Sequence, residues 1–231
     1  MLGGATDLQV VFYKMERSSS PNGKGAGRLE FVGNVGSATV TGASELFVSP
    51  HQLPDEYRIV GSQGMIGIGL DMLGQFTVKE IHEGATDASG WVVIGVGWPL
   101  SGYLAVACDY TTPLALGTRL YVVGYPQGDL GPAAEEPIRE QRIVPFTVVN
   151  PSRASQNWLL DEFIVAEPSY ELGMHGASGS GVYMINSMGS PVRVGIYGGA
   201  VAKEGERGWY GLIVRPQPSS EPDHPQNAAK N

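Results

Sequence analysis

The sequence predicts an all-β fold, and three observations carry this prediction. Short runs rich in Val, Ile, Tyr and Thr recur along the chain, with turn residues between them. Glycine and proline are abundant, with 33 and 16 among 231 residues, which favours many tight connections. The first half of the chain contains no convincing stretch with the 3.6-residue period of an amphipathic helix. A chain of this length can form one large or two small domains with a sizeable core.

The first half of the chain is predicted to form a series of short strands. The first strand is Leu8 to Tyr13, and the Gly/Ser-rich segment Ser18 to Gly27 after it is predicted to be a flexible loop. β-branched and aromatic residues then mark further strands at Arg28–Val32, Gly36–Thr41, Glu45–Val48, Tyr57–Val60, Ile66–Leu70, Phe76–Ile81, Trp91–Val96 and Tyr103–Ala107.

The second half of the chain repeats this pattern from Gly117 onward. Strands are predicted at Thr118–Val123, Arg142–Val149, Trp158–Val165, Gly181–Ile185, Val192–Tyr197 and Trp209–Val214. The polar, proline-rich segment after Arg215 is expected to be disordered or a linker. Two sets of roughly six strands are typical of sandwiches or barrels. A ligand or reaction site would lie most naturally between the two halves.

Composition excludes several classes of function. With a net charge of −8, the chain is not expected to present a basic surface that binds nucleic acid or an anionic membrane. No apolar run is long enough to span a membrane, and the N-terminus does not resemble a signal peptide. The single cysteine, Cys108, excludes an internal disulfide, so we expect an intracellular protein and a buried structural thiol. The histidines and the cysteine lack metal-ligand spacing, so no metal or cofactor is predicted.

The most informative motif is the run Gly176-Ala177-Ser178-Gly179-Ser180-Gly181. A serine flanked by small residues suits a tight turn in which its hydroxyl and nearby backbone N–H groups point at one spot. Acyl-transfer chemistry needs a nucleophile beside donors for a developing oxyanion. The same composition is also common in inert loops.

His51 is the candidate base. It comes just after the apolar segment Glu45–Val48, where a histidine is partly shielded and still reachable. Asp87, just before the segment Trp91–Val96, could orient its ring, although Thr86 to Gly90 also reads as an ordinary turn.

Other carboxylates remain open as the acid. The competitors are Asp71, which lies too close to His51 in sequence, and Asp109, which follows a different strand, with Glu80 and Glu83 as weaker alternatives.

The order His51, Asp87, Ser178 in a β context resembles the chymotrypsin-like serine proteases. ELFVSPHQL is similar to the strand that ends in the catalytic histidine, and GTRLYVVGYPQG to the start of the second barrel. GMHGASGSGVY resembles the nucleophile turn, and RVGIYGGAV with GWYGLIV resembles the strands that line the substrate pocket. The absence of disulfides and the short second barrel are more similar to viral polyprotein-processing proteases than to secreted ones.

The resemblance implies two six-stranded antiparallel β-barrels with the active site in the cleft between them. Residues 1–112 would form the N-terminal barrel, residues 113–215 the C-terminal barrel, and residues 216–231 a disordered tail. Ser178 would be the nucleophile, His51 the base and Asp87 the acid, and the N–H groups of Gly176 and Ser178 would form the oxyanion hole.

The resemblance also implies a substrate pocket. Its base would lie near Leu172, and its walls would be formed by Met174, His175, Tyr197, Gly198 and Gly199, together with Gly173. The apolar Leu172 provides no counter-charge for Lys or Arg, so an apolar or medium-sized residue before the cleaved bond is expected. The two glycines would let a substrate strand approach and pair through its backbone.

These features predict a serine endopeptidase, intracellular and in the host cytoplasm if viral, which acts on a peptide or polyprotein. Ala177 stands where secreted relatives have an aspartate that pairs with a freed N-terminus, so that activation step is not expected here. The alternatives are a protease-like domain that binds peptides without catalysis, a bacterial trypsin-like housekeeping protease, and an unrelated all-β binding module.

Overall fold

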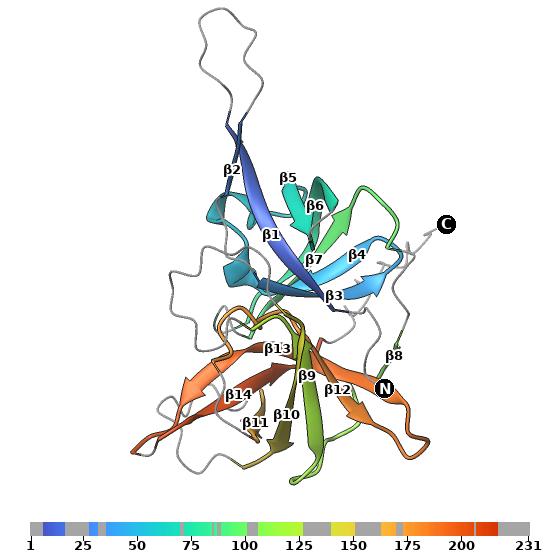
Figure 1. Cartoon of the computed structure of the whole chain (residues 1–231), viewed down its shortest axis with the longest axis vertical. Helices are drawn as coiled ribbons and strands as arrows, with labels where there is room; N and C mark the ends of the chain where they lie inside the picture. The colour runs from blue at the N-terminus through green and yellow to red at the C-terminus, as the bar shows by residue number, and fades with distance from the viewer. Residues whose placement is uncertain are drawn as a thin grey trace, which may run out of the picture.

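The computed structural model of the chain describes residues 7–16, 28–31, 36–69, 72–84, 86, 89–100, 106–126, 140–150, 163–169, 173–205 and 207–216. Their strands form two sheets that each close into a barrel, and the barrels lie one above the other along the longest axis of the molecule (Figure 1). The prediction of an all-β fold with two six-stranded antiparallel barrels is confirmed.

The first barrel is built from the N-terminal strands. Its strands are β1 (Asp7–Glu16), β3 (Gly36–Gly42), β4 (Glu45–Val48), β5 (Gln63–Ile68), β6 (Met72–His82) and β7 (Trp91–Val96). The order around the ring is β1-β3-β4-β7-β6-β5, and the pairing of β1 with β5 closes it. Strand β2 (Arg28–Phe31) pairs with the end of β1, and this hairpin projects away from both barrels in Figure 1.

The second barrel repeats the topology of the first. Its strands are β9 (Arg119–Gly124), β10 (Arg142–Val148), β11 (Ile164–Pro168), β12 (Gly181–Ile185), β13 (Pro191–Ala202) and β14 (Trp209–Val214). The ring order is β9-β10-β11-β14-β13-β12, closed by the pairing of β12 with β9. In both barrels the six strands therefore follow the order first, second, third, sixth, fifth, fourth. A short strand, β8 (Ala107–Cys108), lies parallel to β13.

Each barrel has its own apolar interior. Phe12, Ile66, Phe76 and Ile94 are buried in the first barrel, where the rings of Phe12 and Phe76 meet edge to face with centroids 5.3 Å apart. Leu120, Phe146 and Ile213 are among the buried residues of the second barrel. Burial of each such side chain stabilises the fold by about 1.5–3 kcal/mol. Each barrel therefore has its own core, and a site at the junction of the barrels lies between two closed sheets.

One strand prediction is wrong in the first barrel. Tyr57–Val60 is not a strand: a 3₁₀ helix, η2 (Asp55–Tyr57), precedes a turn that leads into β5. Pro54 directly before this helix and Gly61, with φ of +88°, explain the difference, because both residues favour turns over an extended chain.

Two further strand predictions fall partly outside the described residues. Residues 101–105 lie outside them, and β8 contains only Ala107 and Cys108. Residues 151–162 also lie outside them, and β11 begins at Ile164 and continues to Pro168. The predicted disordered tail falls almost entirely on residues 217–231, which the structure does not describe.

The prediction of a buried Cys108 is wrong. Cys108 is exposed, because β8 is a two-residue edge strand attached to β13. Its Sγ accepts a hydrogen bond from Arg193 Nη2 at 3.1 Å.

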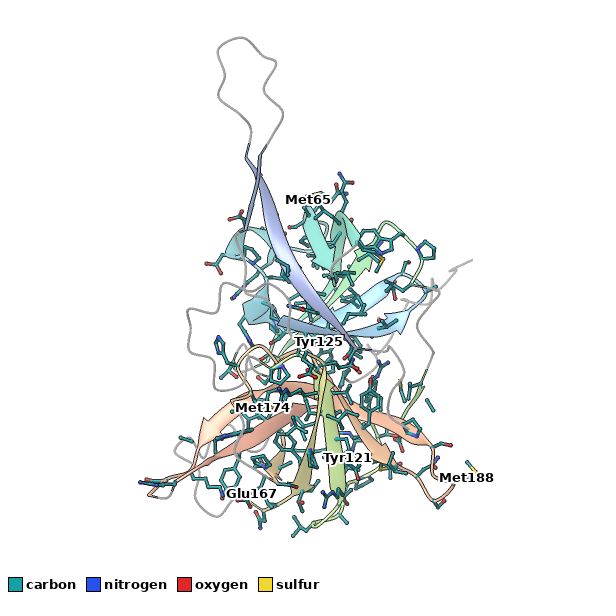
Figure 2. The ribbon with its side chains drawn as sticks, in the orientation of Figure 1. Met65, Tyr121, Tyr125, Glu167, Met174 and Met188 are labelled. Atoms are coloured by element: carbon teal, nitrogen blue, oxygen red, sulfur yellow. The ribbon has the colours of Figure 1, made fainter. Side chains whose placement is uncertain are left out.

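Hydrogen bonds join the two barrels where the ends of their strands meet. Ser37 of β3 accepts a hydrogen bond from the N–H of Tyr125, at 2.9 Å, and donates one to the carbonyl of Gly176, at 3.0 Å. Tyr125 follows β9, and Figure 2 shows it at the level where the barrels meet. Ser37 thus connects the first barrel to the Gly/Ser-rich turn of the second.

Candidate active site

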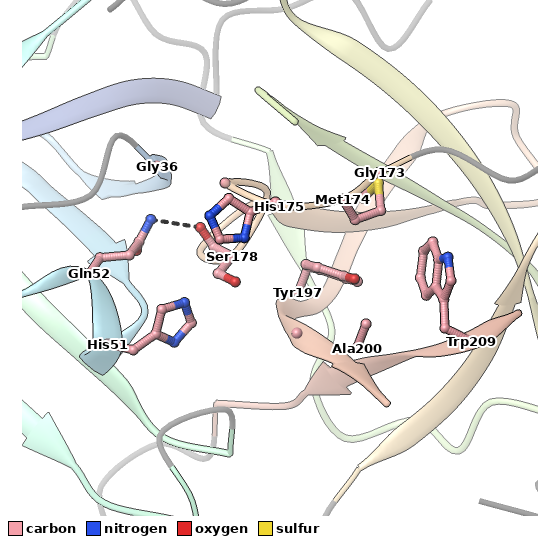
Figure 3. Close-up of a pocket in the computed structure, with 12 residues that line it drawn as sticks. Gly36, His51, Gln52, Gly173, Met174, His175, Ser178, Tyr197, Ala200 and Trp209 are labelled. Atoms are coloured by element: carbon pink, nitrogen blue, oxygen red, sulfur yellow. Dashed lines mark hydrogen bonds between the residues drawn. The ribbon is translucent and has the colours of Figure 1, made fainter. Parts of the chain in front are cut away.

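A pocket of about 380 Å³ opens between the two barrels. The first barrel contributes Gly36, His51 and Gln52. The second contributes Gly173, Met174, His175, Gly176, Ser178, Tyr197, Gly199, Ala200 and Trp209. Figure 3 shows the hydroxyl of Ser178 on the side of the pocket where the ring of His51 lies. The structure therefore brings together the two residues that the sequence singled out as nucleophile and base, which lie far apart in the chain.

A short 3₁₀ helix, η1 (Pro50–Gln52), delivers His51 to the pocket. It follows β4 directly, and Pro50 at its first position is preorganised for a helical turn. Ser49 Oγ lies 2.9 Å from His51 Nδ1. In the tautomer with a proton on Nδ1, the ring donates to Ser49 and Nε2 keeps the lone pair that a general base requires.

Gln52 connects the helix that carries His51 to the turn that carries Ser178. Its side chain is buried, and its Oε1 accepts a hydrogen bond from the N–H of Ser49 at 2.7 Å. Its Nε2 donates to the carbonyl of Ser178 at 2.8 Å, drawn as a dashed line in Figure 3, and to the carbonyl of Ser37 at 3.0 Å. One side chain therefore fixes the spacing between the segments that carry His51 and Ser178. Sequence reasoning missed Gln52, although Ser49 and Gln52 have the spacing of a capping box.

The Gly/Ser-rich turn is held by hydrogen bonds on both sides of Ser178. The N–H of Ala177 donates to the carbonyl of Met174, and the N–H of Ser180 donates to the carbonyl of Ala177, each at 2.9 Å. The N–H of Gly179 donates to the carbonyl of Tyr197, also at 2.9 Å. These bonds fix the orientation of the peptide groups that flank the serine.

The backbone of this turn suits an oxyanion hole. Gly176 and Gly179 have φ angles of +83° and +86°, in the left-handed region that favours glycine. Among the residues that the structure describes, none accepts a hydrogen bond from the N–H of Gly176 or of Ser178. No described residue therefore competes with a ligand for either donor, while the carbonyls of the same two residues are bonded to Ser37 and Gln52.

The structure places two of the five candidate acids away from the pocket. Asp109 Oδ1 accepts hydrogen bonds from the N–H groups of Thr111 and Thr112 at 3.0 and 2.9 Å, and a side-chain hydrogen bond of Thr112 together with these backbone bonds lowers its pKa. Glu80 Oε2 lies 3.0 Å from His82 Nε2. Both carboxylates line a different pocket, of about 500 Å³.

Only one of the other three candidates, Glu83, is among the described residues. Asp87 and Asp71 lie outside those residues. Glu83 lines a small pocket beside Pro50, the neighbour of His51. Gly90 lies beside this helix, because a Cβ on it would lie 3.0 Å from the Pro50 ring. Asp87 therefore stays a prediction as the acid.

The expected substrate pocket is partly described. Met174, His175, Tyr197 and Gly199 line the cavity, Leu172 lies outside the described residues, and Gly198 is buried at an irregularity in the pairing of β13 with β14.

An aromatic wall completes this part of the pocket. Trp209, from β14, lines it and packs against Phe146, with ring centroids 5.8 Å apart. Sequence reasoning missed Trp209 as a pocket residue, because a lone tryptophan in a strand gives no signal that separates a core position from a pocket wall. Tyr197 is also buried, which raises the pKa of its hydroxyl.

No protein-family model matches this sequence, and no curated protein is similar to it. Across the described residues, no helix is long and apolar enough to cross a membrane. The same residues contain no group of three or more His, Cys, Asp or Glu side chains placed to hold a metal ion.

Proposed function

We propose that this protein is a serine endopeptidase of the chymotrypsin-like type. The observation that carries the proposal is the shared pocket of His51 and Ser178 at the junction of two barrels with the same strand order. Gln52 supports the proposal, because its hydrogen bonds to Ser49 and Ser178 hold the segment of the base at a fixed distance from the nucleophile. The N–H groups of Gly176 and Ser178, which no described residue accepts, supply the remaining requirement, a site for negative charge.

In the proposed reaction, Ser178 Oγ attacks the carbonyl carbon of the scissile peptide while its proton passes to His51 Nε2. The carbonyl oxygen becomes an oxyanion that accepts hydrogen bonds from the N–H groups of Gly176 and Ser178. The tetrahedral species collapses as the C–N bond breaks and His51 returns its proton to the leaving amine. A water molecule then attacks the Ser178 ester, with His51 again as base, and releases the second product.

We propose Asp87 as the acid that orients His51. The Ser49 hydroxyl beside Nδ1 can fix the ring, but a neutral hydroxyl stabilises the imidazolium less than a carboxylate does. Asp87→Asn should therefore slow the reaction strongly while the fold is retained. An unchanged rate would remove Asp87 from the mechanism.

We propose a peptide segment within a polyprotein, processed in a host cytoplasm, as the substrate. The supports are the resemblance of the sequence motifs to viral processing proteases and the single cysteine. The apolar wall formed by Met174 and Trp209 favours an uncharged side chain before the cleaved bond.

The test is cleavage of a peptide library, read by mass spectrometry. Wild-type protein should cleave after uncharged side chains, and Ser178→Ala and His51→Ala should each abolish cleavage, because the residues act as a unit. Ser180→Ala is the matched control, since Ser180 lies in the same turn and is also buried. Full activity of Ser178→Ala would reject the proposal. Peptide binding by the wild type without cleavage would favour the non-catalytic alternative.

A further inference from the structure

A buried carboxylate lies between the two barrels, outside the pocket. Asp7, the first residue of β1, is 1 % exposed. Its Oδ1 accepts hydrogen bonds from Thr39 Oγ1 at 2.5 Å and from the N–H of Gly181 at 2.7 Å, and its Oδ2 accepts one from the Tyr183 hydroxyl at 2.6 Å. Thr39 belongs to the first barrel and the other two donors to the second, so the carboxylate bonds both barrels.

The backbone of the same residue also contacts the second barrel. The carbonyl of Asp7 accepts hydrogen bonds from the Tyr125 hydroxyl at 3.3 Å and from Gln141 Nε2 at 3.2 Å. The start of β1 is therefore anchored through both its main chain and its side chain. Burial of a carboxylate is costly unless donors satisfy it, and three donors on different strands converge on this one.

The contacts of Asp7 lead directly to the nucleophile turn. Gly181 lies three residues after Ser178, and Thr39 Oγ1 is 3.0 Å from the carbonyl of Gly179, the residue that follows the serine. A threonine hydroxyl has one proton, so Thr39 can donate to Asp7 or to Gly179 but not to both at once. The protonation state of Asp7 therefore determines which acceptor receives the Thr39 proton.

We propose that Asp7 is a positioning residue for Ser178, which acts through Gly181 and through the Thr39 hydroxyl. With Asp7 ionised, Thr39 donates to the carboxylate and Gly181 is held against β1. With Asp7 protonated, its carboxyl can donate to Thr39, whose own proton then goes to the Gly179 carbonyl. The two states hold the backbone after the serine differently. The inference rests on the proposed role of Ser178 as nucleophile.

Charged and titratable groups of the second barrel act on Asp7. Arg193 of β13 exerts a favourable electrostatic interaction on it, and Tyr183 of β12 donates to it. The Arg193 guanidinium itself donates to the carbonyl of Val40, the residue after Thr39, at 2.6 Å. Burial raises the pKa of Asp7, and these neighbours lower it.

The test is the rate at which a fluorophosphonate labels the serine, measured as a function of pH. Asp7→Asn preserves the shape of the side chain and removes its charge, and Thr39→Val removes only the bridging hydroxyl. Both variants should slow labelling by about tenfold to a hundredfold at neutral pH, because small displacements of a nucleophile have effects of that size. Thr39→Ser, which keeps the hydroxyl, is the matched control and should react at nearly the wild-type rate.

The pH profile separates a positioning role from a purely structural one. Wild-type protein should show an acidic inflection from Asp7 in addition to the histidine step, and Asp7→Asn should lack it. Folded Asp7→Asn and Thr39→Val with wild-type rates and profiles would overturn the inference. If Asp7→Asn does not fold, the comparison of Thr39→Val with Thr39→Ser decides. A wild-type protein that is not labelled would instead reject the proposed nucleophile.

Discussion

Gly179 should tolerate no side chain, and Gly179→Ala tests the packing of the Gly/Ser-rich turn against the first barrel. A Cβ at this position would lie 2.2 Å from the backbone oxygen of Ser37 and 2.9 Å from Gln52 Oε1. Both separations are shorter than the 3.0 Å below which real Cβ contacts essentially never fall. Since the nearer atom belongs to the backbone of β3, the two barrels must move apart or the turn must shift.

Gly61→Ala provides a matched control for the backbone conformation. Gly61 has φ of +88°, against +86° at Gly179, and a Cβ there would meet nothing within 4 Å. The left-handed conformation alone costs an alanine about 1–2 kcal/mol, which is the whole loss expected at Gly61. The steric overlap at Gly179 adds about 1–3 kcal/mol. We therefore expect Gly179→Ala to lose about 2–5 kcal/mol of unfolding free energy.

The measurement is urea-induced unfolding of both variants, followed by tryptophan fluorescence, together with the rate of fluorophosphonate labelling. Gly179→Ala should be less stable than Gly61→Ala by about 1–3 kcal/mol. It should also label slowly under conditions in which it is folded, while the control labels normally. Equal stability of the two variants would refute the contact between the turn and β3.

Three further predictions concern buried polar groups. Tyr197→Phe should leave stability unchanged or raise it by up to about 1 kcal/mol in thermal unfolding, because the hydroxyl is buried with no hydrogen-bond partner among the described residues; a clear loss would contradict this. Gln52→Glu should lower the unfolding free energy by about 2–3 kcal/mol at neutral pH, because it places a carboxylate against two carbonyls. In urea titrations, acidification should restore part of that loss, and a loss independent of pH would contradict this prediction. Burial raises the pKa of Asp7 above its ordinary 3.8, so the folded state binds the proton more tightly than the unfolded state does. The unfolding free energy of wild type, relative to that of Asp7→Asn, should therefore fall as pH rises above about 4. A rise with pH would contradict a raised pKa of Asp7 in the folded state.

The sequence predicts the architecture well because strand signals are local. Runs such as Trp91–Val96 combine β-branched residues with flanking turns, and the structure has a strand with those bounds. The failure at Tyr57–Val60 has a local cause as well: Pro54 and Gly61 favour turns on either side of a segment whose composition alone indicates a strand.

The site is predictable only in part. Ser178 stands out through its glycine neighbours and His51 through its place after an apolar strand, and the structure puts both in one pocket. The contacts of Asp7 with Gly181 and Tyr183 join positions more than 170 residues apart, and no local pattern indicates them. Such contacts follow from how the barrels meet, which depends on the whole fold.

The most direct test of the central claim is to locate the covalent adduct after treatment of the intact protein with a fluorophosphonate. Peptide mapping by mass spectrometry should find the phosphonyl group on Ser178, and His51→Ala should carry little or no adduct, because the hydroxyl needs a base to react. An adduct on another serine, or equal labelling of Ser178 in His51→Ala, would contradict the pairing of these two residues.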